Sequence, residues 1–242
     1  KEIKKEVNQK IIKIGMPSAM QMFFEVALFT GAIWLCGMIG TTSQAANQIA
    51  LSLASLTFMF AMGLSVTAMI RIGNQKGLND YVTLRKVAIS IFLLTVIIEV
   101  VFALLFVLLH TSLPYIFVDI NDVKNLTENL EVIAISANLL LVAAVFQISD
   151  GLQVVVLGAL RGLQDAKIPM YITFVAYWVI GFPISIYLGL ETELKAVGVW
   201  IGLLAGLTAA AIFLYIRFNY LTKKTCSRAN SRTSSITIKR RN

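Results

Sequence analysis

Residues 87–109 read VAISIFLLTVIIEVVFALLFVLL, and this stretch decides the fold class of the chain. It contains a single charged residue, Glu99, and no proline or glycine. An α-helix needs about 20 apolar residues to cross about 30 Å of hydrocarbon. A membrane β-barrel would instead show short segments of alternating polarity. The stretch therefore predicts a transmembrane helix, since a helix satisfies its own backbone polar groups in lipid.

Five further stretches have the same character, so the chain is predicted to be an all-α membrane protein with six transmembrane helices. Its 242 residues are 57% hydrophobic and 14% charged, with a mean hydropathy of +0.78, which excludes an ordinary soluble domain. We expect residues 1–221 to form one transmembrane lobe and the basic segment 222–242 to be a disordered cytoplasmic tail. The predicted spans lie at about residues 11–36, 46–70, 87–110, 130–158, 170–190 and 196–220.

The basic residues gather on one side of the predicted membrane. Of the 21 Lys and Arg residues, only Lys124 and Lys195 fall in connections on the other side. By the positive-inside rule, both termini are predicted to be cytoplasmic and the protein to lie in the cytoplasmic (inner) membrane. The net charge of +8 thus reflects topology, and we expect the lipid bilayer, not nucleic acid, to be its surroundings.

Three acidic residues lie inside the predicted spans: Glu25, Glu99 and Asp150. At the rise of an α-helix each lies about 16–21 Å from the cytoplasmic end of its span, near the middle of the bilayer. An ionisable side chain at that depth costs several kcal/mol unless it has a partner, a watery cavity or a proton. Each acid is therefore a candidate functional residue.

Amide side chains accompany two of the three acids. Gln21 lies four residues before Glu25, and Gln147 lies three residues before Asp150, so each pair shares a helix face. Two such polar stripes facing each other would form a cavity able to hold H⁺, Na⁺ or an organic cation. The alternative is that each acid is a neutral group that holds helices together by hydrogen bonds. Glu99 has mostly apolar neighbours, and both a structural and a functional role fit it.

The sequence carries no pattern typical of an enzyme. It has no Walker A motif, no cluster of His and Cys, and a single histidine, His110, at the end of a span. Cys36 and Cys226 are predicted to lie at opposite membrane faces, which argues against a disulfide. We therefore expect no enzymatic activity and no cofactor, and an ion gradient as the source of energy.

Glycine and proline mark two special positions. Gly198, Gly202 and Gly206 recur at four-residue spacing, which predicts close contact between helices. Pro183 follows Gly181 inside the fifth span and predicts an interruption of that helix.

Several motifs together resemble the carboxy-terminal lobe of multidrug and toxic compound extrusion (MATE) transporters of the NorM type. They occur in the same order and cover nearly the whole chain before the tail. They are Gly15-Met16-Pro17, FFEVALF (23–29), AANQIAL (45–51), FMF (58–60), Arg71-Ile72-Gly73, DGLQ (150–153), GALRG (158–162) and YWVIGFP (177–183).

The resemblance implies a transporter of twelve helices in two six-helix lobes, in which the amino-terminal lobe would be the partner of this chain. It implies antiport, with cationic amphipathic compounds exported in exchange for Na⁺ or H⁺. Glu25 and Asp150 match the acids that bind the coupling ion in such transporters. Residues expected at the substrate cavity are Gln48, which matches a polar cavity residue, together with Gln21, Gln147, Asn47 and Tyr177.

Two other functions are compatible with six membrane helices. A lipid-linked oligosaccharide flippase of the same superfamily would need cavity arginines for anionic headgroups, and the predicted spans contain no arginine apart from Arg217, near the cytoplasmic end of the last one. A channel subunit would need a pore loop or an arginine-rich sensor helix, and the sequence has neither. Both alternatives are therefore less well supported than an antiporter.

Overall fold

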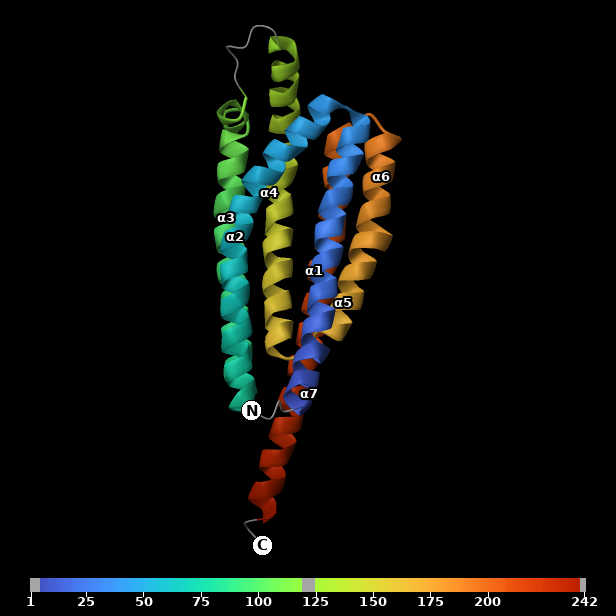
Figure 1. Ribbon diagram of the computed structural model, residues 1–242. Helices are drawn as coiled ribbons and strands as arrows, with labels where there is room; N and C mark the ends of the chain where they lie inside the picture. Colours follow the sequence, from blue (N-terminus) through green and yellow to red (C-terminus); the bar gives the residue numbers. More distant parts are fainter. Residues whose placement is uncertain (1–4, 119–124, 240–242) are drawn as a thin grey trace.

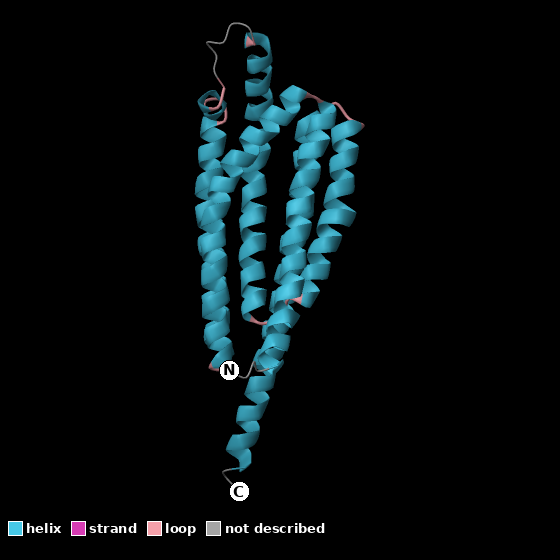
Figure 2. Ribbon diagram, in the orientation of Figure 1, coloured by secondary structure: helices cyan, strands magenta, loops and turns pink. Residues whose placement is uncertain are grey.

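The computed structural model describes residues 5–118 and 125–239, which form a bundle of long helices with no strand among them (Figures 1 and 2). Most connections within these ranges are short turns. In chain order the elements are α1 (Lys5–Ile39), α2 (Thr41–Gly77), α3 (Tyr81–Leu109), η1 (Leu113–Ile116), α4 (Leu126–Gly162), α5 (Lys167–Phe174), η2 (Val175–Gly181), α6 (Phe182–Leu190) and α7 (Lys195–Lys239).

Six of the helical segments are long and apolar enough to cross a membrane, which confirms the predicted number. The fifth consists of α5, η2 and α6 in succession. Several helices run further than the predicted spans, because nothing stops a helix where the hydrocarbon ends. The segments are Ile11–Ile39, Thr41–Gly77, Tyr81–Leu109, Leu126–Gly162, Lys167–Leu190 and Lys195–Lys223.

Helix α4 lies at the centre of the bundle and packs against α2, α3 and α7. Helix α2 begins beside the end of α1 and slants across α4 toward α3 (Figure 1). The lower part of α2 is thereby separated from α1 (Figure 1). Helix α1 packs against α5, α6, α7 and α2. The two ends of the chain lie at the same end of the bundle, as an even number of spans requires (Figure 1).

The outer surface of the bundle is apolar over most of its length. Helix α3, for example, exposes Leu93, Ile97, Leu104 and Leu108, which recur at helical spacing along one side. An apolar patch of this extent is unfavourable in water but matches the hydrocarbon of a bilayer. The polar side chains buried in the spans are turned inward instead.

The fifth span contains a π-helical turn, η2, directly before Pro183. Proline has no N–H to donate to the preceding turn, so a regular helix would be interrupted at this point. The wider turn accommodates the interruption, and the helix continues as α6. It also places Tyr177 on the inner side, where its side chain is fully buried.

The glycines of α7 allow α6 and η2 to pack closely against that helix. A side chain at Gly202 would overlap the backbone nitrogen and the hydroxyl of Ser185, and one at Gly206 would press against Gly181. The Ser185 hydroxyl in turn donates a hydrogen bond of 3.0 Å to the carbonyl of Val199. Close contact of this kind replaces the hydrophobic effect, which does not drive helices together in lipid.

Helix α7 continues past the predicted end of its span as far as Lys239. The sequence contains no proline or glycine after Gly206, so nothing in it ends the helix earlier. The disordered tail is predicted for residues 222–242, of which 240–242 lie outside the described residues. The side chains beyond Lys223 are not described, and disorder of the tail stays a prediction.

The packing of α6 on α7 can be tested with one added methyl group. Gly202→Ala should destabilise the protein by about 1–3 kcal/mol, because the new Cβ meets backbone that cannot move aside. Thermal unfolding in detergent, followed by size-exclusion fluorescence, measures the change. Gly63→Ala is the matched control, since a Cβ at Gly63 meets nothing within 4 Å. Equal melting temperatures for both variants would contradict the close packing.

Candidate functional site

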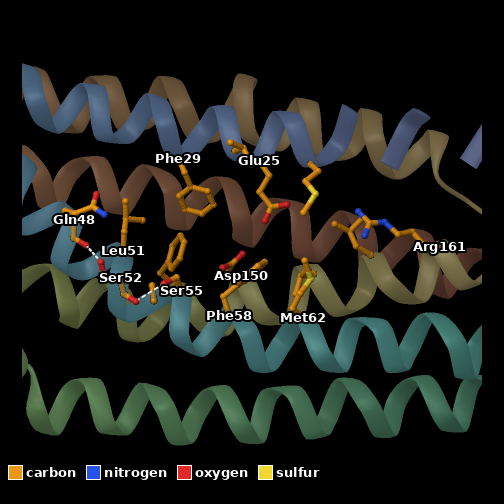
Figure 3. A pocket seen from close by; sticks show the side chains of 16 residues that line it. Glu25, Phe29, Gln48, Leu51, Ser52, Ser55, Phe58, Met62, Asp150 and Arg161 are labelled. Carbon is orange, nitrogen blue, oxygen red and sulfur yellow. Dashed lines mark hydrogen bonds between the residues drawn. The ribbon is translucent and has the colours of Figure 1, made fainter. Parts of the chain in front are cut away.

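A cavity of about 400 Å³ lies between α1, α2 and α4 (Figure 3). Each helix contributes residues spaced three or four positions apart, which is the spacing of one helix face. On α4 the wall is formed by Phe146, Asp150, Val154, Leu157 and Arg161. The cavity therefore runs along the three helices for several turns.

Two acids meet at the middle of this cavity. Glu25 of α1 and Asp150 of α4 point toward the same space from opposite walls (Figure 3). Asp150 is 6% exposed, and its carboxyl interacts electrostatically with that of Glu25. Neither acid is in an ion pair in the described part of the chain, where the ion pair found is Arg217–Asp165 at 2.8 Å. The structure thus brings together the two acids singled out from the sequence.

The remaining wall combines aromatic and small polar side chains. Phe29 and Phe146 meet edge to face with ring centroids 6.0 Å apart, and Phe58 faces the cavity from α2. Gln48 and Ser52 line the end of the cavity farthest from Arg161 (Figure 3). An apolar wall with a few charged groups can bind the body of an amphipathic molecule and fix its charged end.

Arg161 lies at the other end of the cavity, and this corrects the expectation that no arginine lines the cavity. Helix α4 and its membrane segment extend to Gly162, four residues beyond the predicted end. The Arg161 Nη2 donates a hydrogen bond of 3.0 Å to Gln21 Oε1, which joins α4 to α1. Its Nε has no partner.

The structure places the other predicted cavity residues behind the wall. Gln21 is buried, and its side-chain oxygen accepts the hydrogen bond from Arg161. Gln147 points toward α3, where its Nε2 donates to the Glu99 carbonyl at 3.5 Å. A residue three positions away is rotated by about 60° on a helix, so Gln147 need not share the orientation of Asp150. A role of either amide in substrate binding stays a prediction.

Asn47 and Tyr177 also lie off the cavity wall. The Asn47 Oδ1 accepts a hydrogen bond of 2.8 Å from the indole nitrogen of Trp200 on α7. Asn47 and Gln48 are neighbours in sequence, yet about 100° apart on the helix, so only Gln48 reaches the cavity. Tyr177 is fully buried, interacts electrostatically with Glu25, Asp150 and Arg161, and does not line the cavity.

The place of Arg161 on the cavity wall could have been predicted from the sequence. Arg161 follows Asp150 by eleven residues, which is almost a whole number of helical turns, so both side chains share one face. The prediction missed it because the span was ended at residue 158, before the arginine. The aromatic residues Phe29, Phe58 and Phe146 carry no comparable signal, because phenylalanine is common on lipid-facing and core positions alike.

Comparison with known proteins gives a family match and several relatives. The family model described as MatE matches residues 17–187. The chain is 36% identical over 215 residues to a probable multidrug resistance protein NorM of Agrobacterium fabrum, covering 89% of this chain and 45% of the relative. Its counterpart in Rhodopseudomonas palustris is 38% identical over 218 residues, with coverage of 90% and 45%. The chain thus spans about half the length of the curated relatives it matches.

Solved structures share the fold. The eukaryotic MATE transporter AtDTX14 superimposes with a TM-score of 0.77 at 20% identity, over 91% of this chain and 49% of that chain. An outward-facing multidrug resistance MATE family transporter gives a TM-score of 0.82 at 15% identity, over 93% and 49%. At these identities the likeness concerns the fold alone.

The neighbours Asn47 and Gln48 provide a test of the site geometry. Asn47→Leu should lower the free energy of unfolding by about 1–3 kcal/mol, because it leaves the buried Trp200 N–H without an acceptor. Gln48→Leu removes a side chain that faces the cavity and should leave stability nearly unchanged. Thermal unfolding of both variants in detergent measures the difference. A Gln48 variant that is the less stable of the two would show that the faces are assigned wrongly.

Proposed function

The chain belongs to the MatE family of transporters, and from this premise we propose that it is one lobe of an ion-coupled antiporter. The antiporter would export cationic, amphipathic compounds across the cytoplasmic membrane in exchange for Na⁺ or H⁺. A second six-helix lobe, preceding this one, would complete it. The chain's share of about half of its curated relatives supports this second lobe.

One observation carries the proposal: two acids on different helices face a single apolar cavity at the middle of the spans. A carboxylate there is stable only when a cation or a proton accompanies it. The phenylalanines of the wall offer contact to the apolar part of an amphipathic cation, and their ring faces attract its charge. The cavity volume lies within the range of sites for small molecules, about 300–1,000 Å³.

Exchange follows from competition for the same acids. In this proposal an organic cation and a coupling ion compete, directly or through conformation, for Glu25 and Asp150. Binding of Na⁺ or H⁺ from one side of the membrane would release the organic cation, and loss of the ion on the other side would allow the next one to bind. Alternating access then needs only two conformations with different ion occupancy.

The flippase alternative gains one observation, because Arg161 lines the cavity. Arg161 is, however, already held by Gln21, and two acids share the cavity with it. With both acids ionised the three side chains carry a net negative charge, which repels an anionic headgroup. The names of the relatives, probable multidrug resistance proteins, also support an exporter of small molecules.

The roles of the two acids can be tested by amide substitution in the full-length transporter, meaning this chain together with its proposed partner lobe. Glu25→Gln and Asp150→Asn keep size and most hydrogen bonding but remove the titratable charge. Each should abolish export of an organic cation from liposomes driven by a Na⁺ or pH gradient. Both variants should still reach the membrane as monodisperse protein, because neither acid is part of an ion pair.

Two controls accompany this experiment. Glu99→Gln should retain most of the export, since Glu99 does not line the cavity. The 242-residue chain expressed alone should not export, because alternating access requires two lobes that move against each other. Export at the wild-type rate by both amide variants would exclude Glu25 and Asp150 as coupling residues.

Topology is tested by cysteine labelling of intact cells, in a background without Cys36 and Cys226. Leu78→Cys lies in the exposed turn after α2, on the side predicted to be cytoplasmic. Glu193→Cys lies in the exposed turn before α7, on the opposite side. An impermeant maleimide should label the cysteine at 193 and spare the one at 78. The reverse pattern would place both termini outside.

A further inference from the structure

Glu99 is a third acid in the membrane, and it lies behind Asp150. Its side chain is 1% exposed and packs against α4 at Gly151, the residue after Asp150. A Cβ at Gly151 would come within 2.8 Å of the Glu99 Cγ and 2.9 Å of its Cδ and Oε1. Glycine at this position therefore allows the carboxyl group to reach the surface of α4.

The hydrogen-bonding atoms at this contact are nearly all acceptors. Both carboxyl oxygens of Glu99, Oδ1 of Asp150 and Oε1 of Gln147 are buried without a partner. The Gln147 amide nitrogen is directed to the backbone carbonyl of Glu99, and the Thr95 hydroxyl donates to Ile91 on its own helix. The Tyr177 hydroxyl, which interacts with Asp150, and the Gln153 amide nitrogen have no partner among the described residues. Neither is seen to donate to Glu99, and buried acceptors without a donor are costly, so a proton on the Glu99 carboxyl group would give this contact a donor of its own.

The position of each acid indicates which one keeps that proton. The ionisable groups that interact with Asp150 are Glu25, Glu99 and Tyr177, and the cation near Glu25 is Arg161. Asp150 lines the cavity, where a bound cation can neutralise its charge, whereas Glu99 does not line it. A charge on Glu99 would therefore lie in the hydrocarbon with no cation beside it.

We propose that Glu99 is a positioning residue that stays neutral and donates its carboxyl proton to Asp150 as a hydrogen bond when Asp150 ionises. This rests on the proposed function, in which Asp150 binds cations. When a cation enters the cavity, the Asp150 O–H bond breaks and its proton leaves to water in the cavity. Glu99 keeps its own proton, and its O–H group stabilises the new carboxylate from behind.

The experiment uses dicyclohexylcarbodiimide, an apolar reagent that reacts with carboxyl groups in their neutral form. Labelling of Asp150 in the detergent-solubilised full-length transporter is followed by peptide mass spectrometry from pH 4 to pH 9. The variants are Glu99→Leu, which removes the donor, and Glu99→Gln, whose amide N–H replaces it. Thr95→Val is the matched control, because it removes a buried polar group one turn away on the same helix.

In Glu99→Leu, the pH of half-maximal Asp150 labelling should rise by about one unit, a tenfold change in the ionisation equilibrium. Glu99→Gln and Thr95→Val should label as the wild type does. Cation export should be weakened in Glu99→Leu and restored in Glu99→Gln.

Several outcomes would overturn the proposal. One is an unchanged labelling profile in Glu99→Leu. Another is a shift in Glu99→Gln as large as that in Glu99→Leu, because Glu99 would then act by exchanging its proton and not by donating a hydrogen bond. An equal shift in Thr95→Val would show that packing is the cause. An Asp150 that never reacts in the wild type also contradicts it, because Asp150 must become neutral and reachable. Unchanged export in Glu99→Leu, with the labelling shift present, would contradict the proposed function and leave the acid pair standing.

Discussion

The cost of an unpaired charge in hydrocarbon is the constraint on which the arrangement of this bundle depends. Glu25, Glu99, Asp150 and Arg161 lie inside the membrane-spanning helices, and each is directed into the bundle. Glu25, Asp150 and Arg161 face one cavity, while Glu99 is enclosed between α3 and α4. Helix α4, which carries Asp150 and Arg161, packs against α2, α3 and α7. The polar site therefore lies against one of the closely packed helices of the bundle.

Helix α4 meets this requirement with two faces of different character. Gly151, Gly158 and Gly162 recur at nearly whole turns and form a face without side chains. Glu99 packs on the first, the backbone of Ser65 on the second and the Met69 carbonyl on the third. Because lipid does not drive helices together, this close contact supplies the packing energy that fixes α4 against α2 and α3. The other face, about 100° away, is thereby held toward the cavity.

Sequence reasoning could identify the features that follow from one helix at a time. Hydropathy alone indicates six spans, since each span must be apolar over its whole length. It also singles out Glu25 and Asp150, because an acid in such a span is exceptional. It could not tell which way Gln147 and Asn47 point. Their orientations are decided by the neighbours that each helix meets, α3 for Gln147 and Trp200 of α7 for Asn47.

Arg161 shows how a small error in a boundary changes the chemistry of a site. With a span ending at residue 158, the arginine belongs to a loop and the cavity holds only acids. With α4 continued to Gly162, the cavity has a fixed cation at one end and two acids at its middle. For a cation bound at Glu25 and Asp150, the free energy then rises toward Arg161, because like charges repel in a medium of low dielectric constant. Gln21 holds the guanidinium in place, so this barrier is built into the contact between α1 and α4. A cation bound as proposed would thus be held away from the end of the bundle at which α1 begins and α7 ends.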